Sequence, residues 1–247
     1  MSRNLASIIL AAGKGTRMKS DLPKVLHEID GKQLVKYVID QANDSGSVKN
    51  ILVVGYKGDM VIESTKNLNV EYVWQHEQLG TGHAVMMADK SLLGFDGDVL
   101  ILCGDVPALK PETIKELHKN HIENSLSISV LTTKMEDTFG YGRIIKDENG
   151  LVLKIVEEKD ANSEEKLVNE INSGVYLVDR ELLFKALKSV KSENAQKEYY
   201  LTDIVEILKK EGFKVGSYCT PDSDEIMGIN TIEQLNKAKN ILDGRKK

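Results

Sequence analysis

Short apolar runs alternate with longer amphipathic segments through the first 110 residues, and this alternation restricts the possible folds more than any other feature of the chain. The runs are rich in Val, Ile and Leu and have the length of buried strands: LASIILA, KNILVVG, VEYVWQ and GDVLILCGD. The segments between them carry apolar residues at helical spacing: KQLVKYVIDQAND, GDMVIESTKN and GTGHAVMMADKSLL. Repeated strand–helix units predict an α/β fold, with a Rossmann-like, mostly parallel sheet and helices on both faces.

The second half of the chain is less regular and predicts a lobe inserted into the same compact domain, which covers residues 1–247. We expect helices around residues 180–188 and 201–211 and a final helix around 231–242. The expected strands are LSISVLTTK, the two halves of YGRIIKDENGLVLKIVEEKD with a hairpin turn at DENG, SGVYLVD and FKVGSYC. On the final helix, the apolar residues expected to share one face are Ile232, Leu235, Ala238 and Ile241.

Charge and cysteine content limit the classes of partner. The net charge of −5 argues against nucleic acid as the main partner, because nucleic acid requires a basic surface. No window has the length of a membrane span, and the N-terminal apolar run is too short for a secretion signal. Cys103 and Cys219 lie far apart in apolar sequence, which favours reduced core residues over a disulfide. We therefore expect a cytoplasmic protein that binds neither nucleic acid nor membrane.

A glycine-rich turn with basic residues follows the first predicted strand directly, in LAAGKGTRMKSDLPK at residues 10–24. Such a turn commonly directs backbone N–H groups at a phosphate. The dinucleotide-binding fingerprint requires a third glycine where this chain has Met18, and the P-loop pattern GxxxxGK[ST] does not occur. A tight turn with solvated charges is the alternative. Three cations within eleven positions instead favour a bound triphosphate: Lys14, Arg17 and Lys24.

Asp105 and Asn230 are candidate metal ligands. Asp105 follows VLILCG at the end of a predicted strand, so its carboxylate should emerge at the same rim of the sheet as the glycine turn. Asn230 precedes the final predicted helix, and either residue could simply cap local structure. Together they supply two hard oxygen ligands, and Mg²⁺ commonly takes few protein ligands and completes its shell with water and phosphates. The sequence has no Cys or His cluster with zinc spacing.

The turn at residues 10–24 resembles the signature of sugar-phosphate nucleotidyltransferases. Further stretches match in order, and together they resemble the uridyltransferase half of bifunctional bacterial N-acetylglucosamine-1-phosphate uridyltransferases: QLGTGHA, GDVP, YGRI, EEKDA, EINSGVY, NAQKEYYLTD and GIN. The resemblance extends from about residue 5 to residue 232. It implies a nucleotide side at residues 1–110 and a sugar-binding lobe at residues 111–230.

The resemblance also implies roles for individual residues. Uracil would be read by a glutamine amide, which offers a donor and an acceptor, and by the turn after it: Gln75, Gly80 and Thr81. The backbone of the glycine turn would support the nucleotide at Ala11, Ala12, Gly13 and Lys14. The catalytic cations would be Arg17 and Lys24, and the sugar pocket would contain Gly142, Glu157, Asn172 and Tyr199. We expect His83 to pack or to support the site rather than to catalyse.

The implied reaction joins UTP and N-acetylglucosamine 1-phosphate to give UDP-N-acetylglucosamine and pyrophosphate. A phosphate monoester is mostly ionised at pH 7, so the reaction requires no general base. Positioning and charge neutralisation by Mg²⁺, Arg17 and Lys24 should suffice. Two alternatives stay open: an enzyme for another sugar 1-phosphate or nucleotide, such as glucose 1-phosphate or dTTP, and a nucleotide-sugar sensor without turnover.

The bifunctional relatives implied by this resemblance carry an acetyltransferase domain, a left-handed β-helix built from hexapeptide repeats. No hexapeptide period occurs in this sequence. We therefore expect no acetyl transfer from acetyl-CoA to glucosamine 1-phosphate. Without that trimerising element we expect a monomer or a dimer.

Overall fold

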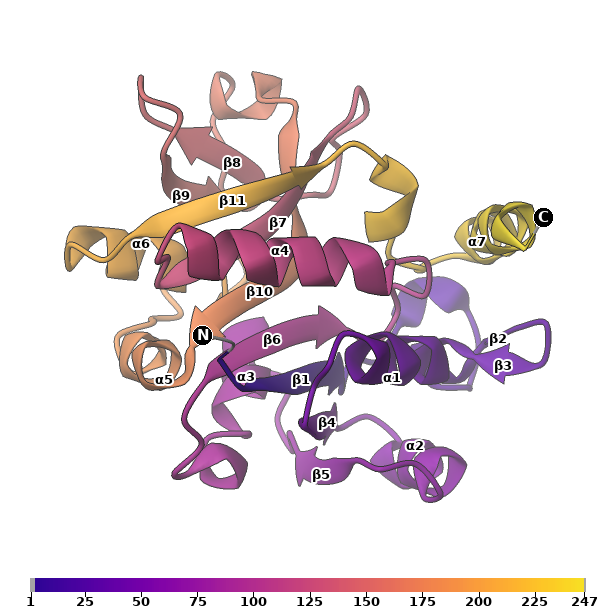
Figure 1. Ribbon diagram of the computed structural model, residues 1–247. Helices are drawn as coiled ribbons and strands as arrows, with labels where there is room; N and C mark the ends of the chain where they lie inside the picture. Colours follow the sequence, from indigo (N-terminus) through magenta and orange to yellow (C-terminus); the bar gives the residue numbers. More distant parts are fainter. Residues whose placement is uncertain (1–2, 247) are drawn as a thin grey trace.

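The computed structural model describes residues 3–246 and shows a central sheet with helices packed on both faces (Figure 1). The strands of this sheet are β1 (Leu5–Ala11), β4 (Lys49–Val54), β5 (Glu71–Trp74), β6 (Asp98–Cys103), β7 (Ile128–Lys134), β8 (Arg143–Lys146), β9 (Val152–Val156), β10 (Glu170–Asp179) and β11 (Val215–Thr220). The helices are α1 (Leu34–Asp44), α2 (Gly58–Thr65), α3 (Thr81–Met86), α4 (Pro111–Glu123), α5 (Arg180–Leu187), α6 (Asp203–Lys210) and α7 (Ile232–Arg245). Two short strands, β2 (Glu28–Ile29) and β3 (Lys32–Gln33), pair as a separate ribbon.

The strand order along the main path of the sheet is β11-β7-β10-β6-β1-β4-β5. Strand β10 runs antiparallel to both of its neighbours on this path, whereas the other adjacent pairs are parallel. The prediction of an α/β fold with a mostly parallel sheet is therefore confirmed. The β8–β9 hairpin joins the sheet through β10 and forms a lobe beside it, with the predicted turn at residues 147–150 (Figure 1).

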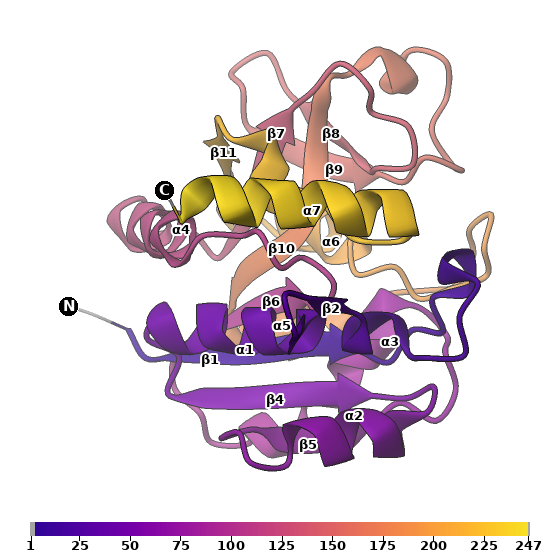
Figure 2. The ribbon, with the colours of Figure 1, turned by 90° about the vertical axis from the view of Figure 1, so that its right-hand side faces the viewer.

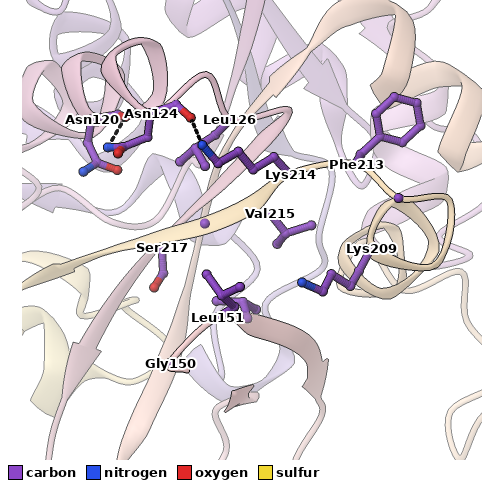
Figure 3. Close-up of a pocket in the computed structure, with 13 residues that line it drawn as sticks. Asn120, Asn124, Leu126, Gly150, Leu151, Lys209, Phe213, Lys214, Val215 and Ser217 are labelled. Carbon is purple, nitrogen blue, oxygen red and sulfur yellow. Dashed lines mark hydrogen bonds between the residues drawn. The ribbon is translucent and has the colours of Figure 1, made fainter. Parts of the chain in front are cut away.

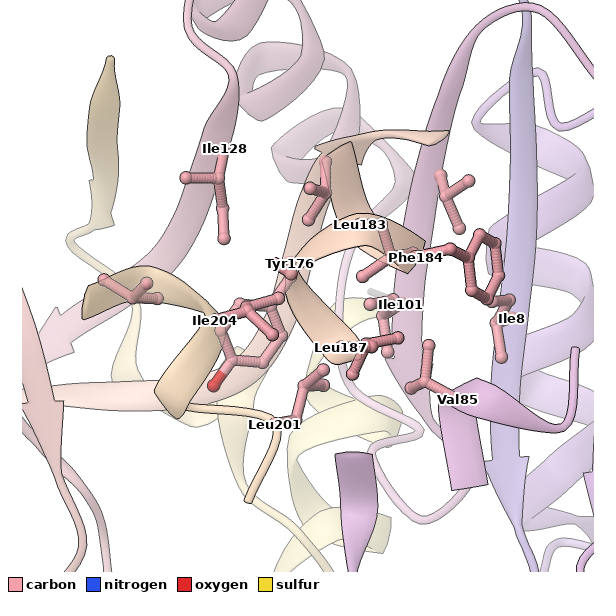
Figure 4. Packing of buried hydrophobic residues seen from close by; sticks show 14 of the residues in the cluster. Ile8, Val85, Ile101, Ile128, Tyr176, Leu183, Phe184, Leu187, Leu201 and Ile204 are labelled. Carbon is pink, nitrogen blue, oxygen red and sulfur yellow. The ribbon is translucent and has the colours of Figure 1, made fainter. Parts of the chain in front are cut away.

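Neighbouring residues on β1 show why helices cover both faces of the sheet. Ile8 and Ile9 are both fully buried, but they pack in two different cores. Ile8 lies in the core beneath α3, α5 and α6, where Val85 of α3 also packs (Figure 4). Ile9 lies in the core beneath α1, α2 and α4, together with Ile114. Because both faces are apolar and covered, the rims of the sheet are where polar side chains can gather.

Helix α4 has no counterpart among the elements predicted from the sequence. Its sequence, PETIKELHKNHIE, is mostly polar, and its apolar residues are few. The helix begins at Pro111, a residue favoured in the first turn, and buries one face that includes Ile114, Leu117 and His121. Strand β10 also begins earlier than expected, at Glu170, so it contains the whole EINSGVY motif.

Helix α7 covers the loop that follows β1, and its N-terminal end lies beside that loop (Figure 2). Residues from both segments form one small apolar cluster, which includes Met18, Ile29, Leu34, Leu235, Ala238 and Ile241. The predicted apolar face of the last helix is wrong at one position, because Ile232 is 50% exposed. Successive steps of three residues drift around a helix, so Ile232 lies on a different side of α7 from the residues that pack in the cluster.

The structure also corrects the expected burial of one cysteine. Cys219 is exposed and Cys103 is partly buried, and both are free thiols. Cys219 lies on β11, a strand at one end of the main path of the sheet. Along residues 3–246, no helix combines the length and apolar character needed to cross a membrane.

A buried carboxylate ties three segments together at the rim opposite the carboxyl ends of the parallel strands. Asp98, at the start of β6, is fully buried. Its carboxylate lies 3.3 Å from Arg3 Nη1, 3.3 Å from His118 Nε2 and 3.6 Å from His121 Nε2. Burial alone would raise the pKa of this carboxyl, but the two histidines and the charge of Arg3 outweigh burial and hold the pKa well below its usual range.

We expect Asp98→Asn to lower the free energy of unfolding by about 2–3 kcal/mol at pH 7, because Arg3 and both histidines lose the anion they share. Since the folded-state pKa of Asp98 is depressed, this stabilisation is present above the ordinary carboxyl pKa of about 4 and is lost as the pH falls below it. Urea unfolding at pH 7 and at pH 3 measures the difference. Equal losses at the two pH values would contradict this account.

Candidate active site

A cavity of about 340 Å³ lies at the carboxyl ends of β1 and β6. Eight of the predicted site residues line it: Ala11, Ala12, Gly13, Lys24, Gln75, Gly80, Thr81 and Asp105. The other lining residues are Leu10, Val25, Gln78, Ala84, Cys103 and Glu198. Motifs that are widely separated in the sequence therefore meet at one cavity, at the rim where ligands of parallel sheets bind.

The turn between β5 and α3 depends on a glycine. Gly80 has a φ of 109°, in the left-handed region, and a Cβ at this position would lie 2.7 Å from the carbonyl oxygen of Tyr199. The same oxygen accepts a hydrogen bond of 2.8 Å from Gly82 N. A larger residue would therefore force this turn and the segment around Tyr199 apart. The QLGTGHA motif and the NAQKEYYLTD motif support each other through this contact.

Gln75 follows β5 directly, and its side chain is held in one orientation. The residue is only 3% exposed. Its Nε2 donates to the carbonyl oxygen of Gly80 at 3.0 Å and lies 3.1 Å from His83 Nδ1. An amide nitrogen can only donate, so both of its hydrogens are used and Oε1 is the atom left for a ligand. The expectation that Gln75 offers both a donor and an acceptor is thus corrected, because its donors already bind Gly80 and His83.

Lys24 connects the two predicted metal ligands. Its Nζ forms an ion pair with Asp105 Oδ2 and donates to Asn230 Oδ1 at 2.9 Å. The lysine stem passes close to the glycine turn, where a Cβ on Gly15 would collide with Lys24 Cβ. This close approach, and the left-handed φ of 63° at Gly15, explain why the second position of the turn must be glycine.

Asp105 and Asn230 meet although 125 residues separate them in the chain. The backbone of the segment before α7 returns to the rim, where Ile229 N donates to the carbonyl oxygen of Asp105 at 3.0 Å. A Cβ on Gly228 would lie 3.5 Å from Asp105 Oδ2, so the chain passes directly over the carboxylate. The sequence-based expectation that the two residues gather at one rim therefore agrees with the structure.

The two other predicted cations lie farther out on the same loop. Arg17 is exposed, and its Nη2 donates to Asn230 Oδ1 at 2.9 Å, so that Asn230 accepts from both Arg17 and Lys24. Lys14 is also exposed, and its Nζ lies 5.6 Å from the centre of the Tyr56 ring. Neither Arg17 nor Lys14 lines the cavity, so only Lys24 among the three lies at its wall.

The donor set at Asp105 and Asn230 fits a hard divalent cation. One carboxylate oxygen and one amide oxygen lie close enough to bind the same ammonium group. Within residues 3–246, no group of three or more His, Cys, Asp or Glu side chains forms a cage for a metal. Two oxygen ligands without a cage match the way Mg²⁺ binds in nucleotide sites, where phosphates and water supply the remaining ligands.

A second cavity, of about 200 Å³, adjoins the first and shares Leu10, Thr81 and Cys103 with it. Three of the four predicted sugar residues line it: Gly142, Glu157 and Asn172. The amide of Asn172 is fixed at both ends, because its Nδ2 donates to Tyr176 Oη at 2.7 Å and its Oδ1 accepts from Gly174 N at 3.0 Å. Each end keeps capacity for one more hydrogen bond to a ligand.

Burial raises the pKa values of four ionisable groups that line this second cavity: Cys103, Tyr141, Glu157 and Tyr176. Burial raises the pKa of the Glu157 carboxyl, although Thr202 Oγ1 donates to it at 3.2 Å and partly opposes the shift. Burial also raises the pKa of the Cys103 thiol to about 12. Cys103 is therefore protonated at neutral pH and is unsuited to act as a nucleophile.

Tyr199, the fourth predicted sugar residue, lines neither cavity. Its ring packs at the edge of the core that contains Ile8, and its backbone N donates to the carbonyl oxygen of Leu79 at 2.8 Å. The adjacent Glu198 lines the first cavity instead. Sequence reasoning missed Glu198, Tyr141 and Thr202, which all lie in or beside the matched motifs.

Arg143 of the YGRI motif supports the backbone of the second cavity and does not line that cavity. Its side chain is nearly fully buried and pairs with Glu158 at 2.6 Å, while its Nη1 donates to the carbonyl oxygen of Tyr141. Glu158 also accepts from Gly140 N at 3.4 Å. The pair thus holds the backbone that leads to Gly142, and it does not face a ligand.

A larger cavity, of about 480 Å³, lies at the opposite rim beside the start of β11 (Figure 3). The ends of α4 and α6 and the turn of the β8–β9 hairpin surround it. Lys214 at its edge donates to the carbonyl oxygen of Asn124 at 2.6 Å. None of the predicted site residues lines this cavity, so the two adjoining cavities at the carboxyl rim form the candidate site.

Comparison with known proteins supports a single family. The family model described as nucleotidyl transferase matches residues 6–225. The bifunctional protein GlmU of Clostridioides difficile is 46% identical over 242 residues, and that of Caldanaerobacter subterraneus is 49% identical over 241 residues. Each match covers 98% of this chain and 52% of the relative, so the chain spans about half the length of these curated relatives.

Solved structures also share the fold. A crystal structure of UDP-glucose pyrophosphorylase complexed with UDP-glucose superposes with a TM-score of 0.78. The match covers 98% of this chain and 99% of the other chain, at 20% sequence identity. At this identity the likeness extends to the fold alone.

Proposed function

Because the chain belongs to the nucleotidyl transferase family, we propose that it transfers the uridylyl group of UTP to N-acetylglucosamine 1-phosphate and releases pyrophosphate. The observation that carries the proposal is the pair of adjoining cavities at the carboxyl rim. The first presents Gln75 Oε1 and the Lys24 ammonium, and the second presents Glu157 and Asn172. The ordered motifs of the sequence support the choice of substrates within the family.

The first cavity suits a uracil base. Gln75 Oε1 is an acceptor, and uracil carries an N–H donor at N3 next to carbonyl oxygens. Cytosine has an unprotonated N3, so its lone pair would face Gln75 Oε1 and the contact would be repulsive. The turn at Gly80 and Thr81 lines the same cavity and would present backbone groups to the base, while the glycine lets this turn pack against Tyr199.

Lys24 brings positive charge to the wall of the nucleotide cavity, and Arg17 adds a second cation at Asn230. The sugar phosphate attacks the α-phosphorus in line, and the bond between the α-phosphorus and the bridging oxygen of pyrophosphate breaks. The attacking phosphate is already ionised at pH 7, so no side chain needs to remove a proton. The work of the chain is therefore to align two anions and to offset their repulsion.

Asp105 and Asn230 would hold Mg²⁺, which when bound neutralises phosphate charge next to the reacting atoms. Lys24 contacts both of these residues, and Asn230 Oδ1 already accepts from Arg17 and Lys24, so Mg²⁺ would have to displace one of these hydrogen bonds when it binds. In the second cavity, Glu157 accepts hydrogen bonds from sugar hydroxyls, and the fixed amide of Asn172 forms a rigid wall. Tyr199 would then act by supporting the turn at Gly80.

Pyrophosphate release with a panel of substrates tests the proposal. UTP, dTTP, CTP and ATP would each be paired with N-acetylglucosamine 1-phosphate and with glucose 1-phosphate, in the presence of Mg²⁺. We expect UTP with N-acetylglucosamine 1-phosphate to give a kcat/KM at least about tenfold above every other pair. A higher value for dTTP or glucose 1-phosphate would identify a different transferase. Binding of the nucleotide sugar without any pyrophosphate chemistry would identify a sensor.

Gln75→Ala should reduce the preference for the correct base. The variant loses the acceptor that faces uracil N3, and a site built around that hydrogen bond cannot replace it. We expect kcat/KM for UTP to fall about ten- to a hundredfold, with a much smaller change for CTP. Competition between the two nucleotides measures the ratio. An unchanged preference for UTP over CTP would refute the assignment of the base pocket.

A further inference from the structure

In the hydrogen bond between Gln75 and His83, the donor and the acceptor can be identified. Gln75 Nε2 lies 3.0 Å from the carbonyl oxygen of Gly80 and 3.1 Å from His83 Nδ1. The carbonyl oxygen can only accept, so the amide nitrogen must be the atom that faces it. His83 Nδ1 must therefore accept the second amide hydrogen, which requires a neutral imidazole with its proton on Nε2.

We propose that His83 is the positioning residue that sets the choice of nucleotide base, because its Nδ1 lone pair keeps Gln75 Oε1 turned toward the cavity. The inference rests on the proposed function, since it concerns how the base site distinguishes uracil from cytosine. A glutamine amide can turn about its last side-chain bond and exchange Oε1 with Nε2. Turned in that way, Gln75 would offer donors to the cavity, and these suit the unprotonated N3 of cytosine.

Two acceptors, one from the backbone and one from His83, oppose this exchange. After a turn of the amide, Gln75 Oε1 would face both the carbonyl oxygen of Gly80 and the lone pair of His83 Nδ1. Removing one acceptor halves the number of contacts that fix the orientation. Because Gln75 is almost fully buried, a mispaired amide would have little water to compensate it.

Two neighbouring groups, the backbone of α3 and the Tyr199 ring, fix the position of His83. The carbonyl oxygen of Gly80 also accepts the first hydrogen bond of α3, from Ala84 N at 3.1 Å. On the other side, the His83 ring lies 6.2 Å from the Tyr199 ring at an angle of 34° between the planes. A helix backbone and an aromatic neighbour therefore hold the imidazole beside Gln75. Tyr199 lines neither cavity, and its contact with His83 gives this residue of the NAQKEYYLTD motif a structural role.

A pair of substitutions at His83 separates the acceptor from the ring. His83→Phe keeps an aromatic ring beside Tyr199 but removes Nδ1. His83→Asn removes the ring but places Oδ1, an acceptor, the same number of bonds from the backbone as Nδ1 of histidine. We expect the UTP/CTP ratio of kcat/KM to fall about three- to tenfold in His83→Phe, as for the loss of one hydrogen bond, and to stay within about twofold of wild type in His83→Asn.

A double-mutant cycle shows whether His83 acts through Gln75. In the Gln75→Ala background, His83→Phe should leave the UTP/CTP ratio unchanged, because the amide it orients is absent. A similar loss in both backgrounds, or a loss in His83→Asn as large as in His83→Phe, would overturn the inference and indicate a packing role only. If His83→Phe does not fold, His83→Leu supplies the variant without an acceptor, and thermal unfolding checks each protein.

Failure of this inference is distinguishable from failure of the proposed function. If wild type shows no preference for UTP over CTP, or Gln75→Ala retains the preference, the proposed base pocket is wrong. If wild type prefers UTP and Gln75→Ala loses the preference while His83→Phe keeps it, only the role of His83 is wrong.

Discussion

Asp105→Asn should lower kcat at least about a hundredfold, the effect of losing one strong electrostatic stabiliser. The substitution preserves size and polarity but removes the negative charge that pairs with Lys24 and that would anchor Mg²⁺ beside Asn230. Asp105 lies at a rim, and the side chains that pack the two cores on either side of the sheet do not include it. The fold should therefore survive the change. Steady-state pyrophosphate release at saturating substrates measures the loss.

The metal dependence provides the second arm of this experiment. Wild type should be inactive in EDTA and should recover on addition of Mg²⁺, and Asp105→Asn should require a higher Mg²⁺ concentration for its residual activity. Asp40→Asn is a matched control, because Asp40 also pairs with a lysine but lies on the exposed side of α1. Turnover that is insensitive both to EDTA and to Asp105→Asn would eliminate the metal-dependent mechanism.

The alternation of apolar runs and amphipathic segments predicted the fold because it reflects burial on both faces of a sheet. Ile8 and Ile9 illustrate this, since consecutive apolar residues are stable in a strand only when both faces are covered. The pattern carries no information on strand direction, and nothing local in SGVYLVD predicts that β10 runs against its neighbours. Helix α4 was not predicted because its few buried residues are separated by many polar and charged ones, so its apolar pattern is weak.

The candidate site could be predicted to the level of residue types, but its contacts could not. Asp105 follows an apolar strand, so its place at the rim could be expected from the sequence. The approach of Asn230 depends on the path of the segment before α7, which only the folded chain reveals. The expectation that Gln75 has a free donor was wrong for a related reason. Its amide hydrogens are used by Gly80 and His83, and a sequence does not show which hydrogen bonds are already satisfied within the chain.

Lys24→Met should also lower kcat strongly, by about a hundred- to a thousandfold. Methionine keeps an unbranched stem of similar length, which preserves the packing against Gly15, but it removes the ammonium group. Lys24 is the predicted cation that lines the nucleotide cavity, whereas Lys14 and Arg17 are exposed on the outer part of the loop. Neither Lys14 nor Arg17 is therefore placed to replace the ammonium group of Lys24. Single-turnover measurement with saturating UTP separates a loss in the chemical step from weaker binding.

Comparison with Asp105→Asn distinguishes the two roles in the cluster. If Asp105 is a metal ligand, excess Mg²⁺ should restore part of the activity of Asp105→Asn, because mass action compensates for weaker metal binding. Excess Mg²⁺ should not restore Lys24→Met, because the ammonium that is lost belongs to the chain, lines the first cavity and, in the proposed function, would offset phosphate charge there. Lys119→Met, on the exposed side of α4, controls for the loss of a lysine. Full rescue of Lys24→Met by Mg²⁺ would show that Lys24 serves only to hold Asp105 and Asn230 in place.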